Sequence, residues 1–169
     1  VNRQLIVGPN AITGEWGHNP LPGYDPALDG PSQPCYCGRD NCIERFVSGT
    51  GFAGRFVERH GRGLSPIGII TAAAEGDVEA EAHYDHFIQA LARSVASLIN
   101  VLDPDVIVLG GGLSNIDRLY LDLPQALTPY LFSDRCITPM VPARYGDSSG
   151  VRGAAWLPSC VEGATTWAI

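Results

Sequence analysis

The stretch Cys35-Tyr36-Cys37-Gly38-Arg39-Asp40-Asn41-Cys42 contains three cysteines, and a histidine, His18, lies upstream of it. Three thiolates and one imidazole form a ligand set that is typical of a closed, tetrahedral zinc site. Gly38 and Asn41 both tolerate a positive φ, which a loop folded tightly around an ion often requires. We therefore expect one structural zinc ion in this part of the chain. The predicted ligands are His18, Cys35, Cys37 and Cys42.

The cysteines have a second interpretation, as disulfide partners or as buried apolar residues. The chain contains five cysteines, an odd number, and Cys35 and Cys37 are too close in sequence to form a bridge easily. We expect the other two, Cys136 and Cys160, to be reduced thiols. Because four protein ligands leave no position for water, the ion would be structural, which argues against a zinc hydrolase.

The composition describes a globular chain. With 169 residues, of which 17% are charged and 45% hydrophobic, the chain can form one sizeable core or two small ones. Its net charge of -7 argues against nonspecific binding to nucleic acid or to anionic membranes, since both depend on clustered Lys and Arg. No apolar run approaches the length of a membrane span. We expect a cytoplasmic protein without membrane contact.

A long loop should precede a helical region. Residues 9–41 are rich in Gly, Pro, Asn and Asp, and their prolines prevent a long helix. A structureless loop of this size is unusual in a compact domain, and a bound metal would order it. After the cysteines, Ser48-Gly49 should interrupt a helix and Asp77 should cap another. The spacing of apolar residues predicts helices over residues 43–60, 66–74 and 77–102.

The second half of the chain has the pattern of an α/β fold. Residues 105–109 are apolar and mostly β-branched, which predicts a central parallel strand covered on both faces. This strand ends at Gly110, Gly111 and Gly112, and a helix over 115–127 should follow. Ligands bind at such carboxyl ends, although the glycines could equally form only a tight turn. Further along we expect a strand over 137–141 and a helix over 151–157.

Two acidic residues flank the predicted zinc ligands. Glu15 lies three positions before His18, and Glu44 follows the last cysteine of the cluster. Carboxylates accept hydrogen bonds from vicinal hydroxyls, and an imidazole that binds zinc through one nitrogen can donate from the other. These groups suit a polyhydroxylated ligand. The alternative is that Glu15 is a solvated loop acid and Glu44 a helix-start acid favoured by the helix dipole.

Taken together, these motifs strongly resemble the ROK family (repressors, open reading frames, kinases). The resemblance rests on Gly14-Glu15-Trp16-Gly17-His18, Cys35-x-Cys37-Gly38-x-x-x-Cys42-x-Glu44, Ser48-Gly49-x-Gly51, Val108-Leu109-Gly110-Gly111-Gly112 and Gly150-Val151-Arg152-Gly153-Ala154-Ala155. Within the family, the sequence GEWGHNPLP at residues 14–22 looks most like that of bacterial fructokinases. Two positions depart from the usual pattern, because Ala11 and Asn41 stand where glycine is common.

The resemblance implies an α/β fold of the actin-like ATPase (ribonuclease H-like) type, of which this chain would be the C-terminal half. Residues 1–157 would form the C-terminal lobe of a ROK sugar kinase, with the zinc loop 9–42 inside it, and residues 158–169 a tail. The enzyme would phosphorylate a hexose, with fructose as the expected substrate, and would use ATP and magnesium. Its phosphate loop and catalytic aspartate would belong to the N-terminal lobe, so we expect no catalytic residue in this chain and no activity from it alone.

The resemblance also implies roles for individual residues. The sugar would contact Glu15, His18 and Glu44, with His18 also a zinc ligand, and the nucleotide would lie along Gly110, Gly111 and Gly112. Family members are often homodimers or tetramers. The alternatives are a glucose or N-acetylglucosamine kinase, a sugar-sensing ROK repressor with a DNA-binding helix-turn-helix upstream, and a zinc-stabilised interaction module with no small ligand.

Overall fold

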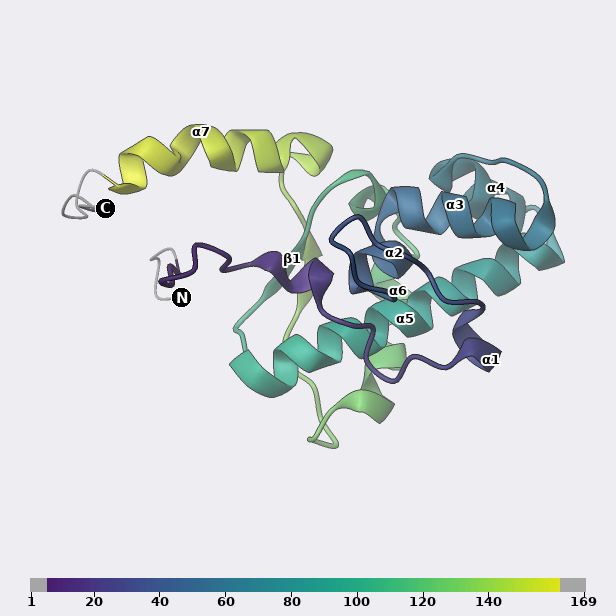
Figure 1. Cartoon of the computed structure of the whole chain (residues 1–169), viewed down its shortest axis with the longest axis horizontal. Helices are drawn as coiled ribbons and strands as arrows, with labels where there is room; N and C mark the ends of the chain where they lie inside the picture. The colour runs from purple at the N-terminus through teal and green to yellow at the C-terminus, as the bar shows by residue number, and fades with distance from the viewer. Residues whose placement is uncertain (1–5, 162–169) are drawn as a thin grey trace.

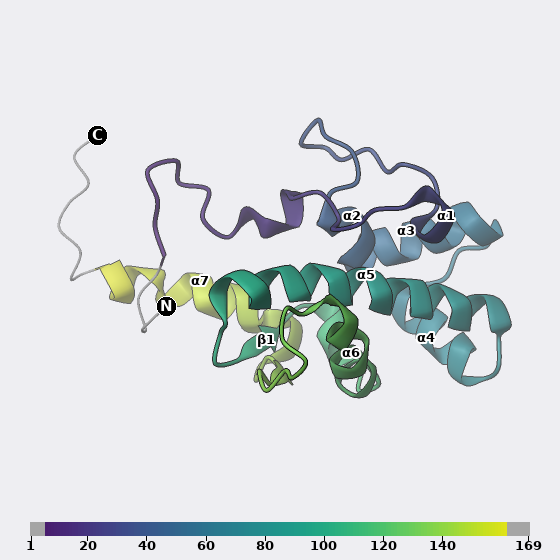
Figure 2. The same ribbon diagram turned by 90° about the horizontal axis from the view of Figure 1, so that it is seen from below.

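Helix α5 (Val78–Leu102) is the central element of the fold, and most of the other helices pack against its two sides. The computed structural model describes residues 6–161. Figure 2 shows the cysteine loop, α2 (Ile43–Val47) and α3 (Gly49–His60) on one side of α5. On the other side lie α4 (Pro66–Ala74), α6 (Leu119–Leu127) and the strands.

The sequence of α5 explains its length and orientation. The Asp77 side chain accepts hydrogen bonds from the backbone N–H groups of Glu79 and Ala80, so it caps the helix as predicted. Apolar residues recur every three or four positions and face the core. The core contains, among its fully buried side chains, Phe52, Phe56, Ile69, Tyr84, Val95, Leu119, Leu123 and Leu127.

The predicted helix over 43–60 is broken at Ser48, as expected. Ser48 is extended, with ψ 158°. Its Oγ accepts a hydrogen bond from Gly51 N, and this bond caps the N-terminus of α3. A Cβ at Gly51 would lie 2.4 Å from the carbonyl oxygen of Arg45. The turn between α2 and α3 therefore requires glycine at this position, because the two backbones approach too closely for a side chain.

The composition of the region before Cys42 had suggested a long loop, but the structure shows short helices in it. It contains a 3-10 helix, η1 (Glu15–His18), and a short α-helix, α1 (Pro26–Asp29), which Asp25 caps. Isolated antiparallel bridges join Pro20 to Cys42 and Pro34 to Asp40. The prolines exclude long helices but leave room for single turns.

The sheet contains two parallel strands among the described residues. Strand β1 (Ile107–Leu109) pairs with β2 (Met140–Pro142), with Ile107 opposite Met140. The prediction of a strand covered on both faces is wrong for this part of the chain, because the side chain of Val108 is 57% exposed. Ile107 and Leu109, on the other face of β1, pack against the hydrophobic core. The face that contains Val108 would be buried only if a further layer of helices or strands covered it.

The connection after β1 also differs from the expectation. The 3-10 helix η2 (Gly112–Asn115) follows the strand, and α6 begins only at Leu119. The predicted helix start at 115 was therefore too early, because Ile116 is extended and interrupts the helical backbone. Helix α6 continues into a further turn, η3 (Thr128–Tyr130).

The last described elements are η4 (Gly146–Ser148) and α7 (Ser149–Val161). Figure 1 shows α7 projecting away from the helices that surround α5. Helix α7 runs past residue 157, where the resemblance placed the end of the lobe. Among the described residues, no helix combines the length and apolar character needed to cross a bilayer.

A candidate metal centre beside two carboxylates

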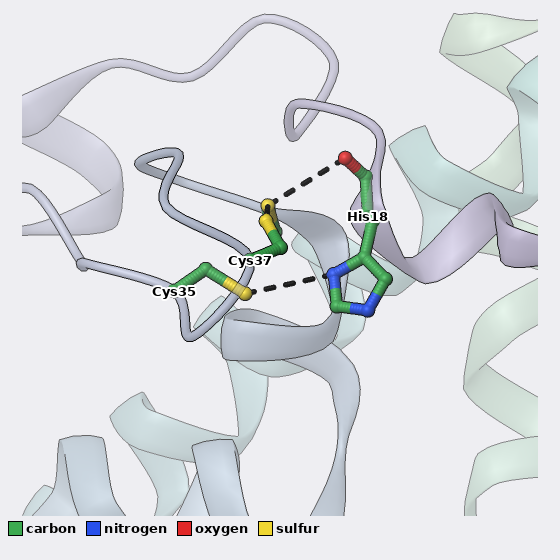
Figure 3. A group of neighbouring side chains, drawn as sticks. His18, Cys35 and Cys37 are labelled. Carbon is green, nitrogen blue, oxygen red and sulfur yellow. Dashed lines mark hydrogen bonds between the residues drawn. The ribbon is translucent and has the colours of Figure 1, made fainter.

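The four predicted zinc ligands come together in the structure. Figure 3 shows three of them, His18, Cys35 and Cys37. Their donor atoms all lie within 4.8 Å of one another. His18 Nδ1 is 3.6 Å from Cys35 Sγ, and the Sγ atoms of Cys37 and Cys42 are 3.5 Å apart. Tetrahedral bonds of zinc to nitrogen and sulfur would separate such pairs by about 3.6 and 3.8 Å. The donor set and its spacing therefore fit a zinc ion.

The backbone of residues 33–42 folds into a tight turn that presents the sulfurs. Cys35 N donates to Arg39 O at 2.8 Å, and Gly38 N donates to Cys35 O at 3.0 Å. Gly38 and Asn41 have φ values of 84° and 57°, so both adopt the positive φ that the sequence predicted. Ala11, the other departure from the family pattern, also has a positive φ, of 51°. Both substitutions therefore keep the backbone conformation that glycine would adopt.

The three thiols have different environments. Cys35 and Cys42 are buried, whereas Cys37 is exposed. The backbone N–H of Arg39, and next the neighbouring thiols, lower the pKa of Cys37 to about 7. Burial raises the pKa of Cys42. A bound cation would favour the thiolate form of all three. Zinc would have four protein ligands here and would order the loop. Of the two remaining cysteines, Cys136 is a free thiol, and the side chain of Cys160 lies outside the described residues.

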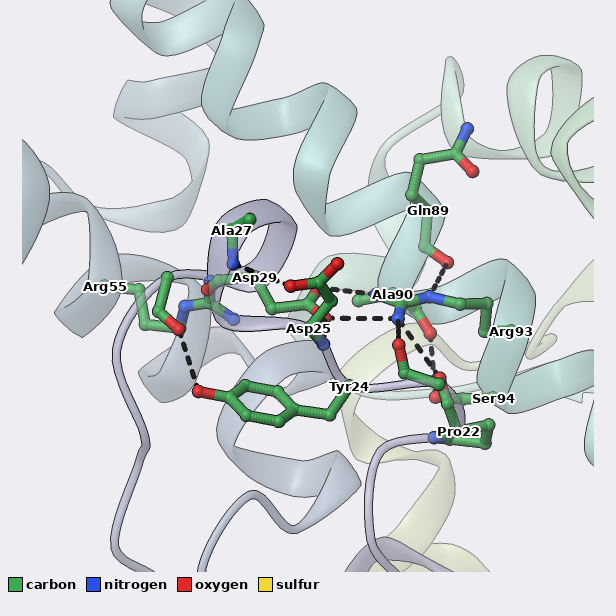
Figure 4. Close-up of polar contacts among 12 residues, drawn as sticks. Pro22, Tyr24, Asp25, Ala27, Asp29, Arg55, Gln89, Ala90, Arg93 and Ser94 are labelled. Atoms are coloured by element: carbon green, nitrogen blue, oxygen red, sulfur yellow. Dashed lines mark hydrogen bonds and ion pairs between the residues drawn. The ribbon is translucent and has the colours of Figure 1, made fainter.

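A buried ion pair provides a second attachment of the loop, at the side of α5 (Figure 4). Arg93 Nη2 donates to Asp29 Oδ1 at 2.5 Å and Nη1 to Oδ2 at 3.1 Å. Nη1 also donates to the carbonyl oxygens of Pro22 and Gly23, at 3.1 and 2.8 Å, and Arg55 donates to the carbonyl oxygen of Asp29. Residues 22–29 are therefore attached to α5 without any metal ligand. Sequence reasoning missed this pair, because nothing distinguishes Asp29 from the other acids of the loop.

The carboxylates that flank the cluster face the second nitrogen of His18. With Nδ1 toward Cys35, Nε2 lies 3.8 Å from Glu15 Oε2 and 3.6 Å from Glu44 Oε2. Glu15 belongs to η1 and Glu44 to the first turn of α2. The structure thus brings together the three residues that we expected to contact a sugar. It adds Tyr36, whose hydroxyl is 2.8 Å from His18 Nε2 and which the sequence did not single out.

The glycines after β1 form a separate, open region. Gly110, Gly111 and Gly112 are exposed, and a Cβ at either of the last two would meet no atom within 4 Å. Leu113, the next residue, lies against the start of α3, because a Cβ at Gly49 would be 3.8 Å from its Cγ. A ligand could therefore reach this backbone without displacing a side chain.

Solved structures share this fold. A ROK hexokinase from Thermus thermophilus superimposes with a TM-score of 0.72 and 27% identity, over 90% of this chain and 50% of that one. A ROK glucokinase from Streptomyces griseus, in complex with glucose and AMPPNP, gives a TM-score of 0.70 with 22% identity, over 87% and 51%. The fold is thus the α/β fold of the actin-like ATPases, as the resemblance to the ROK family implied.

Curated relatives are named N-acetyl-D-glucosamine kinases. The protein from Yersinia pseudotuberculosis serotype O:1b is 41% identical over 160 residues, which are 93% of this chain and 53% of that protein. The protein from Aliivibrio fischeri is 40% identical over 157 residues, 91% and 52%. This chain spans about half the length of these relatives. They do not confirm the fructokinase assignment and agree with its stated alternative.

The sequence matches the ROK family over residues 1–160. The match includes the histidine and cysteine cluster, both carboxylates and the glycines after β1. This chain belongs to the ROK family.

Proposed function

We propose that this chain is the sugar-binding part of an ATP-dependent sugar kinase, and that N-acetylglucosamine is its first candidate substrate. The observation that carries the proposal is the convergence of Glu15 and Glu44 on His18 Nε2, beside a cluster whose donors fit zinc. The choice of sugar draws on the names of the curated relatives. Fructose and glucose are the competing substrates.

The geometry supports a division of roles at the sugar. If zinc occupies Nδ1 of His18, the ring carries its proton on Nε2, which becomes a hydrogen-bond donor. Glu15 and Glu44 have only acceptors when ionised, so they would accept hydrogen bonds from sugar hydroxyls while His18 donates to one. Together they would fix the orientation of the ring, which is what a transferase needs in order to present one hydroxyl to a phosphate.

We propose that the nucleotide lies along Gly110, Gly111 and Gly112, whose exposed backbone offers N–H groups to phosphate or ribose. Phosphoryl transfer also needs a base for the hydroxyl proton and magnesium on the phosphates. We assign these to a second lobe, with residues 1–157 as the C-terminal lobe and 158–169 as its tail. On this proposal the complete enzyme works in the cytoplasm, where ATP is available, and this chain alone does not turn over.

Sugar binding by the 169-residue chain tests the proposal. Calorimetric titration of the zinc-loaded chain with N-acetylglucosamine, glucose and fructose should give saturable binding, tightest for N-acetylglucosamine. Glu44→Gln should weaken it about 10- to 100-fold, since a hydrogen bond to a charged group is lost. Glu75→Gln, an exposed acid on another helix end, is the matched control and should change nothing.

Two outcomes would favour other functions. Absence of binding for all three sugars would favour a zinc-stabilised interaction module. Binding of sugar without ADP formation, even when an N-terminal kinase lobe is supplied, would favour a sugar-sensing repressor. The latter has a structural counterpart in a ROK family transcriptional regulator, described as a homolog of the E. coli MLC protein, with a TM-score of 0.66 and 22% identity.

A further inference from the structure

Tyr36 makes a contact that neither the zinc cluster nor the sugar site requires. It lies between two predicted ligands, Cys35 and Cys37, and its hydroxyl is 2.8 Å from His18 Nε2. The two rings meet edge to face, with centroids 4.9 Å apart and an interplanar angle of 88°. Tyr36 is nevertheless 83% exposed. Its position therefore depends on the neighbouring cysteines and on this hydrogen bond, and very little on packing.

The nitrogen that Tyr36 contacts is the one that faces the carboxylates. Glu44 Oε2 and Glu15 Oε2 are 3.6 and 3.8 Å from Nε2, both farther away than the tyrosine hydroxyl. A neutral imidazole whose Nδ1 faces a metal has one N–H to donate. With zinc on Nδ1, that donor would have an acceptor already in place, the phenol oxygen of Tyr36 at 2.8 Å. A sugar hydroxyl that needs the same donor must take its place.

We propose that Tyr36 is a specificity-determining residue, whose hydroxyl occupies the position of a sugar hydroxyl and leaves it when the sugar binds. The proposal rests on the sugar site described above. A phenol and a sugar alcohol both offer an O–H group, so each can accept from Nε2 and donate to a carboxylate. Because the ring is exposed, its displacement costs one hydrogen bond and an edge contact, and no core packing.

This arrangement makes binding selective. A ligand that offers an acceptor to His18 and donors to both carboxylates replaces every hydrogen bond that Tyr36 gives up. A ligand without a hydroxyl at that position displaces Tyr36 without replacing its hydrogen bond, and a site with an unpaired polar group disfavours such a ligand.

Tyr36→Phe tests the proposal, because it removes the competing hydroxyl and keeps the ring. In the zinc-loaded 169-residue chain, calorimetry should show N-acetylglucosamine binding about 3- to 10-fold tighter than in the wild type, the value of one ordinary hydrogen bond. Tyr130→Phe is the matched control. It also removes an exposed tyrosine hydrogen bond, to Gln89, but on η3, and should leave the affinity unchanged. Zinc content measured on both variants verifies that the cluster is intact.

A second measurement does not depend on sugar. In ¹H–¹⁵N spectra of the imidazole groups, the Nε2–H signal of His18 should move in Tyr36→Phe and stay in place in Tyr130→Phe. An unmoved signal, or equal or weaker sugar binding by Tyr36→Phe, would overturn the role of Tyr36 and leave the sugar site standing. Failure of both the wild type and the variant to bind sugar would overturn the sugar site and the role of Tyr36 with it.

Discussion

Replacing Asp29 with alanine removes the carboxylate that pairs with Arg93 and should lower the free energy of unfolding by about 3 kcal/mol. The side chains of the pair are 4% and 10% exposed, so the remaining guanidinium would be poorly solvated. Breaking such a pair costs about 3 to 5 kcal/mol. The lower value applies because the carbonyl oxygens of Pro22 and Gly23 would still accept from Arg93. The melting temperature should fall by about 6 to 12 °C.

The assay is urea unfolding of the zinc-loaded chain with Asp29→Ala, Arg93→Ala and the double variant. Because the two groups interact directly, the double variant should lose clearly less stability than the sum of the single changes. Asp134→Ala alters an exposed acid and should change stability by less than about 0.5 kcal/mol. A loss below about 1 kcal/mol for Asp29→Ala, or additive single changes, would refute the view that this pair attaches the loop to α5.

Three further changes probe the loop, the turn and the core. Cys42→Ser should abolish stoichiometric zinc binding and raise amide hydrogen exchange in residues 30–41, while exchange in α5 stays slow; fast exchange in both would contradict a local role for the cluster. Gly51→Ala should destabilise the chain by about 2 kcal/mol in urea unfolding, because the added Cβ would lie 2.4 Å from the carbonyl oxygen of Arg45. Alanine by itself favours helices, so a gain in stability would disprove the close approach. Burial lowers the pKa of His83 to about 4, below its unfolded value of about 6.5. Below about pH 6.5 the unfolded state therefore binds a proton that the folded state does not, and the free energy of unfolding should fall by about 2 kcal/mol from pH 7 to pH 5. His83→Gln should lose that part of the pH dependence, and an unchanged pH profile in this variant would contradict the role of His83.

The helical half of the fold follows from local signals. Asp77 caps α5 and Ser48 separates α2 from α3, and both effects act within three residues, so the sequence alone reveals them. The histidine and cysteine cluster was equally predictable, because few chemistries need one imidazole and three thiols at such spacing. Glu15 and Glu44 could be placed near His18 for the same reason, since each is close in sequence to a predicted ligand.

Features that depend on distant parts of the chain were not predictable. Asp29 and Arg93 are far apart in sequence, and an acid in a loop gives no sign of a buried partner. Tyr36 could be read only as the residue between two cysteines, because its hydrogen bond depends on where η1 lies relative to the turn. The exposure of Val108 was missed because a β-branched run indicates a strand but does not reveal which layers cover it.

The attachment of the cysteine loop to α5 has a consequence for how the protein would exchange an ion bound at the cluster. Arg93 binds residues 22–29 through contacts that include no metal ligand, and α2 fixes the other end of the loop at Ile43. Loss of the ion would thus release only a short flap between two fixed points. The entropy of closing a chain segment grows with its length, so recapture should be faster and tighter than for a free peptide with the same cysteines. Metal supply could then vary without the helical body having to refold.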